Sequence, residues 1–319
     1  DARTHKDLQE DDALAAETSV VLLTANPEVA GEEQLEKWVR HLSSMCGEWK
    51  RTAEVEEAAK VALLQACKAT SMDLLRGQHG LFLSAQKLSS LPEAFGQLTV
   101  LELLGLEHNQ LSSLPESFGQ LRALRELHLQ NNELSTLPVS FGQLTSLEAL
   151  SLENNQLTSL PESFGQLVAL QRLHLDYNQL SCLPESVGQL RALGKLHFQS
   201  NQVAWLPESF GQLRALQQLH LDFNQLSMLP EKICQLRALT WLRFEHNLLS
   251  SLPKSFGQFE ALEFLRLNDN DLSRLPETIG RLRALRCLDL QNNQLRNLPE
   301  SFGQLIALEQ LHSKGNELS

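Results

Sequence analysis

Three histidines give the chain its clearest regular set of chemically active side chains. His174, His197 and His220 follow one another at steps of 23 residues. Imidazoles titrate near neutral pH and bind transition metals. No carboxylate or cysteine spacing along the sequence supports a defined metal site beside them, so we expect no metal and no other cofactor. We predict a neutral ladder of rings, whose protonation at low pH would weaken binding or packing by mutual repulsion.

The sequence contains no recognisable catalytic motif, so we predict that the protein is not an enzyme. The sequence holds no GxxxxGK phosphate loop, no GxSxG and no HExxH, and no GxGxxG in a suitable context. Cys46 and Cys67 could serve as nucleophiles, but neither has a histidine or acidic partner at a recognisable spacing. The five cysteines are odd in number and widely spaced. This usage is typical of reduced thiols, which favours the cytoplasm.

Net charge excludes some classes of partner. The formal net charge is −12, which argues against non-specific binding to nucleic acid or anionic membranes, because phosphates attract positive surfaces. The longest apolar run in the N-terminal part, residues 20–23, is far shorter than a membrane span. We therefore expect a protein partner, with no nucleic acid, no membrane and no small-molecule substrate.

A strict internal repeat positions the histidines. The octapeptide LPESFGQL occurs at residues 114–121, 160–167, 206–213 and 298–305. Prolines recur every 23 residues from Pro92 to Pro299, and asparagines do so from Asn109 to Asn316. A period this strict predicts a solenoid, in which each unit buries its apolar face only by stacking on its neighbours.

Each fixed letter of the unit has a physical role. In one copy, Leu127 and Leu129 alternate with an outward residue, which predicts a short parallel strand with one buried face. Asn132 is expected to bond free backbone groups and to form a buried ladder with its equivalents. Pro138 should start a short helical or 3₁₀ turn on the outer side, with Phe118 and its equivalents packed beneath. We expect the glycine of FGQ to end this turn with a positive φ.

This pattern, LPxxFGQLxxLxxLxLxxNxL, resembles the 23-residue class of intracellular leucine-rich repeats over residues 81–319. That class occurs in plant Ras-group repeat proteins, in Scribble- and Erbin-like scaffolds, in Ras-regulating scaffolds and in bacterial repeat proteins. The resemblance implies an α/β fold: a curved solenoid with a parallel sheet on its concave face. Cys287-Leu288-Asp289 also spells the CxD of bacterial ubiquitin ligases with such repeats. Here, however, it falls inside a repeat strand, so we discard a catalytic role.

Residues 1–80 carry no repeat. Apolar residues follow helical spacing in two stretches, 32–49 and 52–75. We predict a helical N-terminal cap domain at 1–80, which covers the open edge of the first repeat, followed by about ten 23-residue repeats at 81–319 with an incomplete C-terminal end. A separate helical docking domain is the alternative. The second stripe comprises Val55, Ala59, Ala62, Leu63, Ala66 and Cys67.

The variable positions predict where a partner binds. Three positions in each copy point to the concave face: the two that flank the first strand leucine and the one before the ladder asparagine. In the copies between residues 172 and 266, these positions would form one patch about 20 Å long, rich in the aromatic and arginine side chains of interface hot spots. The alternative is that these side chains only decorate a solvated face. The predicted patch comprises Arg172, His174, Tyr177, Lys195, His197, His220, Phe223, Trp241, Arg243, His246, Phe264 and Arg266.

The sequence thus predicts a non-catalytic protein-interaction module that binds a protein partner on its concave face. Asp176, Asp222 and Glu245 flank the patch, so its charge is mixed. The alternative function is the recognition portion of a larger signalling protein or of a secreted bacterial effector, whose activity lies outside this chain. An effector would act in the host cytosol.

Overall fold

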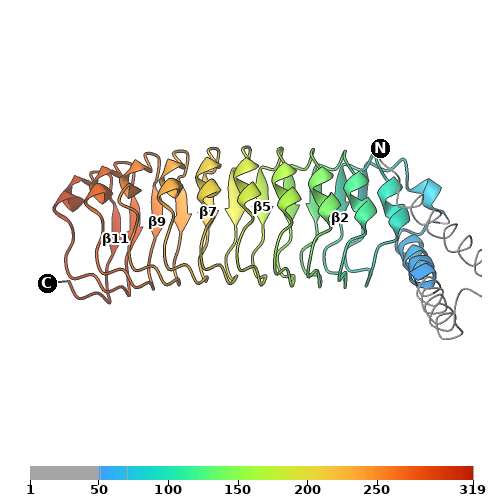
Figure 1. The fold of residues 1–319 in the computed structure, drawn as a ribbon, viewed down its shortest axis with the longest axis horizontal. Coiled ribbons are helices and arrows are strands. Elements are labelled where there is room, and N and C mark those ends of the chain that lie inside the picture. The colour runs from blue at the N-terminus through green and yellow to red at the C-terminus, as the bar shows by residue number, and fades with distance from the viewer. Residues whose placement is uncertain (1–49, 51, 70, 319) are drawn as a thin grey trace, which may run out of the picture. The chain divides into compact units, whose positions relative to one another are not determined.

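Parallel strands in chain order make up the main unit of the protein. The structure, a computed structural model, describes residues 50, 52–69 and 71–318. The chain divides into two compact units, 1–55 and 56–319, and the second holds one eleven-stranded sheet (Figure 1). Its strands are β1 (Gly80–Phe82), β2 (Leu103–Gly105), β3 (Glu126–His128), β4 (Ala149–Ser151), β5 (Arg172–His174), β6 (Lys195–His197), β7 (Gln218–His220), β8 (Trp241–Arg243), β9 (Phe264–Arg266), β10 (Cys287–Asp289) and β11 (Gln310–His312).

The 23-residue period sets the register of this sheet. Each strand residue pairs with the residue 23 positions later, so Leu173 lies beside Leu196 and His174 beside His197. The central leucines of β2 to β10 are buried, as Leu173 and Leu196 are, while most of the flanking residues stay at least partly exposed. Period-two alternation therefore produces a buried leucine row and two outward rows, as the sequence predicted.

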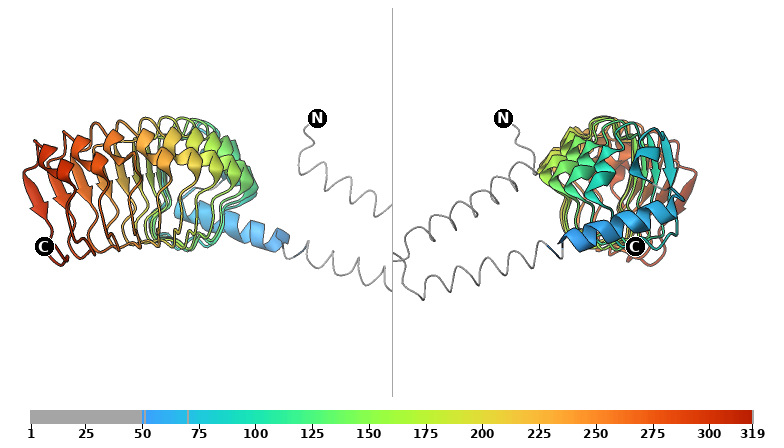
Figure 2. Two further views of the ribbon diagram at one scale, coloured as in Figure 1. Left: turned by 60° about the vertical axis from the view of Figure 1, so that its left-hand side comes forward. Right: turned by 90° about the vertical axis from the view of Figure 1, so that its right-hand side faces the viewer.

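A helix covers residues 52–66, and its part within the second unit, residues 56–66, lies at the N-terminal end of the repeats (Figure 2). Ala59 and Leu63 of this part are buried, and Leu63 belongs to the same hydrophobic core as the first repeats. Ala62, Ala66 and Cys67 are partly buried against that core. This confirms a helical cap.

Two parts of the cap prediction have a different outcome. Val55 was expected in the buried stripe but is exposed; it is the last residue of the first compact unit. The stripe at 32–49 lies outside the described residues. Residues 56–80 belong to the same compact unit as the repeats, and the assignment of 1–80 as one domain stays a prediction.

The asparagines form the predicted ladder. Asn224 donates from Nδ2 to the carbonyl oxygens of Phe198 (3.0 Å) and Leu221 (3.1 Å), and its Oδ1 accepts from the backbone N–H of Val203 at 3.0 Å. Asn201 repeats this arrangement one coil earlier. Each buried amide therefore joins neighbouring coils through backbone groups that the bend leaves unpaired.

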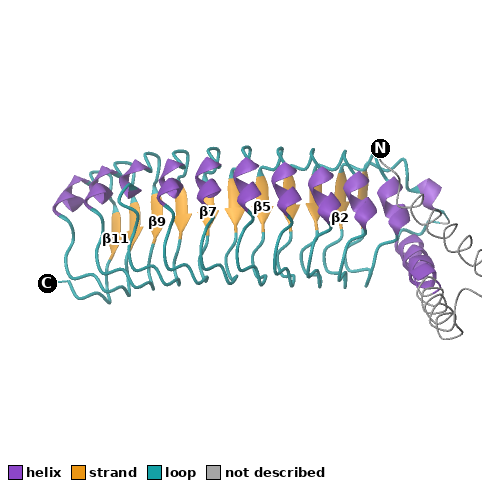
Figure 3. Cartoon of the chain, in the orientation of Figure 1, coloured by secondary structure: helices purple, strands orange, loops and turns teal. Residues whose placement is uncertain are grey.

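The outer side of the coils carries short 3₁₀ turns, as predicted (Figure 3). Stacked phenylalanines lie beneath the first turns; the rings of Phe118 and Phe141 have centroids 6.2 Å apart. The turns are η1 (Met72–Leu74), η2 (Glu93–Gln97), η3 (Glu116–Gln120), η4 (Val139–Gln143), η5 (Glu162–Gln166), η6 (Glu185–Gln189), η7 (Glu208–Gln212), η8 (Glu231–Gln235), η9 (Phe256–Gln258), η10 (Glu277–Arg281) and η11 (Glu300–Gln304).

The role predicted for the turn glycines was wrong. Among the described glycines, only Gly315 has a positive φ. A Cβ on Gly119 would instead collide with the carbonyl oxygen and Cβ of Ser140 in the next coil. Glycine is needed here because the outer turns pack closely against one another, and not because of the backbone conformation.

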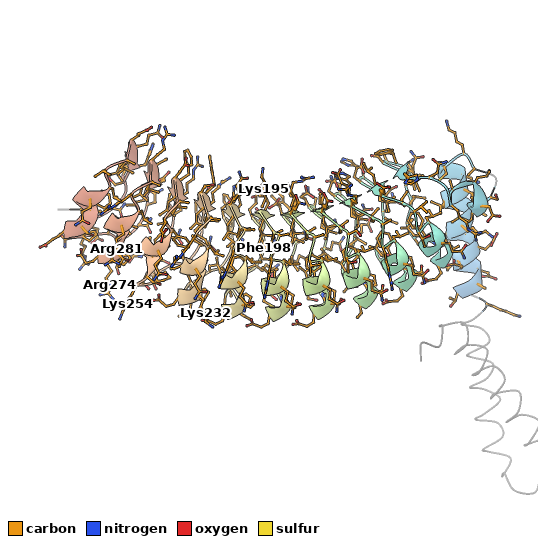
Figure 4. The ribbon with its side chains drawn as sticks, turned by 90° about the horizontal axis from the view of Figure 1, so that it is seen from above. Lys195, Phe198, Lys232, Lys254, Arg274 and Arg281 are labelled. Carbon is orange, nitrogen blue, oxygen red and sulfur yellow. The ribbon has the colours of Figure 1, made fainter. Side chains whose placement is uncertain are left out.

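The array curves with its strands on the inside. In Figure 4, Lys195 of β6 lies on the inner side, Phe198 lies between the two sides, and Lys232 and Lys254 lie on the outer side. Neighbouring strands lie about 4.8 Å apart, whereas the ring centroids of Phe95 and Phe118, beneath two neighbouring outer turns, lie 6.0 Å apart. This difference makes the outer side longer and gives the sheet a concave face.

Candidate functional site

The fold brings the predicted patch together. Its residues all come from the five adjacent strands β5 to β9 or from the turn that follows each strand. None of these side chains belongs to the buried core, since each is partly or largely exposed.

The histidine ladder is present as a stack. The ring centroids of His174 and His197 lie 4.4 Å apart, and those of His197 and His220 lie 4.3 Å apart, the latter pair tilted by only 6°. Burial lowers the pKa of His197 to about 4, helped by the neighbouring His174 and Lys195. Burial also lowers the pKa of His220 to about 3, with His197 and Arg243 adding to the effect. These two rings are therefore neutral at physiological pH.

Two aromatic pairs lie beyond the histidines. Trp241 of β8 stacks on Phe264 of β9 with centroids 4.3 Å apart, and Phe223 stacks on His246 at 4.2 Å. The indole Nε1 of Trp241 is buried and has no hydrogen-bond partner among the described residues. Such flat, stacked surfaces can take further apolar or aromatic groups with little loss of side-chain entropy.

Two exposed aromatic residues, Tyr177 and Phe223, adopt an energetically unfavourable backbone conformation. Tyr177 and Phe223 both have φ of 55° and are about half exposed, at 56% and 51%. The left-handed region is unfavourable for bulky residues, and such outliers gather at functional sites. Equivalent positions elsewhere hold residues that tolerate it better, such as Asn131 and Asp269. The structure thus adds a reason to regard these aromatics as functional.

Sequence reasoning underrated one row of residues. Asp176, Asp222 and Glu245 were taken as flanking groups, yet they are 5%, 3% and 4% exposed and form the floor of the face. They occupy the position after the second strand leucine, where polar residues recur in every copy. That recurrence was the available signal, but alternation alone does not show that the position is buried.

Arg243 neutralises two of these carboxylates. Its guanidinium donates to Glu245 from Nε at 2.8 Å and approaches Asp222 Oδ2 at 3.4 Å. Arg266 contributes a weaker contact to Glu245, at 3.7 Å. Burial and the nearby Glu245 raise the pKa of Asp222. The network holds Arg243 in place, so this side chain serves the floor of the face first and is less available to a partner than Arg266.

The third buried carboxylate has a different environment. Asp176 accepts a hydrogen bond from the backbone N–H of Gln199 at 3.1 Å and lies near His174. Its burial raises its pKa to about 6. One oxygen of Asp176 and one ring nitrogen each of His174 and His197 lie within 4.8 Å of one another. The search along the sequence missed this group because the 23-residue coil, and not local spacing, brings His197 to it.

Family comparisons identify the repeats. A model described as a leucine-rich repeat region matches residues 62–156, and one described as leucine-rich repeats in two copies matches residues 145–188. Two further models, each described as a leucine-rich repeat, match residues 214–272 and 284–305. A leucine-rich repeat protein of Leptospira interrogans is 31% identical, with 78% of this chain and 82% of that chain covered and a TM-score of 0.53. The chain belongs to the leucine-rich repeat proteins. The intracellular 23-residue class is a finer assignment and stays a prediction.

Some of the other similar solved structures are complexes. The plant peptide hormone receptor RGFR1, in complex with RGF2, is 31% identical with a TM-score of 0.59; the match covers 71% of this chain and 42% of that receptor. A chain of the octameric complex of latrophilin 3, Unc5D and FLRT2 is 28% identical with a TM-score of 0.60 and 76% of each chain covered. Curated proteins give no match. No helix among the described residues is long and apolar enough to cross a membrane.

Proposed function

We propose that this leucine-rich repeat protein is a non-catalytic protein-binding module, whose partner binds the concave face between β5 and β9. The observation that carries the proposal is the exposed aromatic surface. Tyr177 and Phe223 hold an unfavourable backbone conformation, and Trp241 stacks on Phe264 at a position that faces out of the core. Since exposed aromatics and arginines dominate interface energies, this surface is better suited to a partner than to solvent.

The charges around the aromatics favour a mixed contact. Lys195 and Arg266 are exposed, and Arg172 forms only a surface ion pair with Glu126 at 3.3 Å. These cations can meet acidic side chains of a partner at the rim, while the stacked rings take apolar ones at the centre. The structures of similar repeats in complexes with a peptide or with other proteins are in keeping with such a role.

The proposal is tested by a double substitution on the face. Truncating a hot-spot aromatic typically costs 2 kcal/mol or more, so Trp241→Ala with Phe264→Ala should weaken binding by at least about 30-fold. A pull-down with the intact chain would supply the partner, and calorimetry would measure its affinity. Arg122→Ala and Glu116→Ala, on the outer side, are the controls and should change the affinity little.

A reversal of that pattern would place the site elsewhere. If the outer-side variants lose binding while the Trp241/Phe264 pair retains it, the outer face or the helical cap becomes the candidate. The double variant should fold like the wild type, because Trp241 and Phe264 lie outside the buried core. An unchanged far-ultraviolet circular dichroism spectrum would check this.

A second candidate is the recognition portion of a larger protein. The chain spans 42% of the length of RGFR1 and thus corresponds to a part of that receptor.

For the location we propose the cytoplasm, supported by Cys67, Cys182, Cys234 and Cys287, which are free thiols. Fractionation of cells with an antibody to the repeats would test this, and recovery only from the medium or cell surface would contradict it.

A further inference from the structure

We propose a zinc site on the concave face, formed by His174, Asp176 and His197. One ligand atom from each residue lies within 4.8 Å of the others. Two residues come from β5 and its following turn, and the third comes from β6, so the ion would join two neighbouring coils. This site does not depend on the proposed partner surface, although it lies at one end of it.

The repeat itself supplies the comparison that points to a cation. Two coils further on, the same three positions hold His220, Asp222 and Arg243. There the arginine side chain is the cation beside the buried aspartate, with Nη2 3.4 Å from Oδ2 of Asp222. In the first set, His197 stands where Arg243 stands in the second. The buried carboxylate is equally enclosed in both sets, but only the second contains its own cation.

Asp176 is therefore a buried carboxylate whose charge no lysine or arginine among the described residues neutralises. It is 5% exposed, and among the described residues no lysine or arginine forms an ion pair with it. Asp176 accepts one hydrogen bond, from the backbone N–H of Gln199, but a buried carboxylate charge remains costly unless a cation or a metal ion neutralises it.

The histidines are suited to receive the ion. Nε2 of His197 is buried without a hydrogen-bond partner among the described residues. Glu153 Oε1 lies 3.5 Å from Nδ1 of His174, where a carboxylate can orient a metal-bound imidazole.

The ligand types select the metal. Two imidazoles and a carboxylate are typical of zinc, whereas calcium and magnesium prefer oxygen ligands alone. Ligand atoms around a tetrahedral zinc ion lie roughly 3.3 Å apart, as bonds of about 2.05 Å require. The three groups need to close by about 1.5 Å at most from 4.8 Å, which side-chain rotation can supply. Water can take the fourth position.

The test titrates metal into the chelator-treated 319-residue chain. We expect one equivalent of Zn²⁺ to bind in calorimetry and Co²⁺ to give the visible absorption of a four-coordinate site without thiolate bands. Asp176→Asn and His197→Gln should each weaken Zn²⁺ binding by at least about 10-fold, since even the loss of a second-shell partner costs 10- to 100-fold. Mg²⁺ and Ca²⁺ should give no heat.

His128→Gln is the matched control, because His128 occupies the same strand position in β3 and lies outside the proposed set. It should bind Zn²⁺ like the wild type. Absence of Zn²⁺ binding to the wild type at tens of micromolar, equal binding by the Asp176 and His197 variants, or a thiolate band with Co²⁺ would each overturn the site. If Asp176→Asn fails to fold, His174→Gln replaces it, since that side chain is 30% exposed.

Discussion

Single residues in this protein act through their position in the coil more than through their neighbours in sequence. Asn224 and Tyr177 show the two extremes. Asn224 is buried and its side chain bonds four backbone groups, so its identity is fixed by structure. Tyr177 is exposed and adopts a backbone conformation that asparagine would adopt at lower cost, so its identity requires another explanation. Sequence analysis predicted both positions, but only the backbone angles distinguish the costly residue from the fitting one.

Removal of a ladder amide should destabilise the coil strongly. In Asn224→Ala, the buried backbone N–H of Val203 loses its partner, and an unsatisfied buried group costs about 1–3 kcal/mol. The carbonyl oxygens of Phe198 and Leu221 each lose one of two side-chain donors. We expect the free energy of unfolding to fall by roughly 2–4 kcal/mol. Urea denaturation followed by circular dichroism would measure this. Gln225→Ala, at the exposed neighbouring position, should cost less than about 0.5 kcal/mol; equal losses would mean that the ladder is not a major source of stability.

The histidine stack should make stability depend on pH in a defined window. His220 has a folded pKa of about 3, lowered first by burial and then by His197 and Arg243, whereas the unfolded chain protonates its histidines near 6.5. Between these values the unfolded state binds more protons, so this residue makes stability fall as the pH falls. Asp176 has the opposite effect, because burial raises its folded pKa to about 6. Between pH 6 and the ordinary pKa of an aspartate the folded state binds more protons, so this residue makes stability rise as the pH falls.

His220→Gln should isolate the histidine contribution. The variant lacks the group that the unfolded state protonates, so it should lose less stability than the wild type between pH 7 and pH 4.5. Urea denaturation at both pH values, in a chelating buffer, gives the two differences. A loss in the variant that equals the loss in the wild type would show that the ring is already exposed to solvent in the folded protein.

The elements follow closely from the repeat, with one instructive failure. The strands, the asparagine ladder, the outer 3₁₀ turns and the buried phenylalanines were all predictable, because each depends on alternation or on a turn residue within one unit. The role of glycine was not predictable in this way. The contact that excludes a side chain at Gly165 comes from Ser186 in the next coil, and a single unit does not contain it.

Two glycines at the same position allow this reading to be tested. A Cβ on Gly165 would collide with the backbone and Cβ of Ser186, whereas nothing lies within 4 Å of a Cβ on Gly303 in the last turn. Neither residue has a positive φ. Gly165→Ala should therefore cost about 1–3 kcal/mol through overpacking, and Gly303→Ala should be neutral or slightly stabilising. Thermal and urea unfolding of the two variants would measure the difference; similar losses would restore backbone conformation as the reason for glycine.

At the scale of the molecule, the buried core is a one-dimensional stack whose stability depends on contacts between neighbouring coils. The sequence predicted where the candidate patch lies, because the period places equivalent residues side by side. It did not predict the buried carboxylates or the His174–Asp176–His197 group, because both depend on how deep a row lies below the rim. Depth is a property of the assembled face and leaves little trace in the spacing of residues.

The N-terminal helix should stabilise the whole stack through a single buried leucine. Leu63 is fully buried in the same core as Leu83 and Leu88 of the first repeat, whereas Val61 on the same helix is 44% exposed. Leu63→Ala should lower the free energy of unfolding by about 2–5 kcal/mol, since it removes core contacts and leaves a cavity. Val61→Ala, the matched control, should change it by less than about 0.5 kcal/mol.

Because repeats unfold from weakened ends, the Leu63→Ala variant should also lose amide-exchange protection first in β1 and β2, while β6 and β7 keep theirs. Hydrogen exchange measured by mass spectrometry would resolve the two regions. If the variant is as stable as the wild type and β1 and β2 remain protected, the helix packs on the repeats without stabilising them, and the first coil is stable with its edge open.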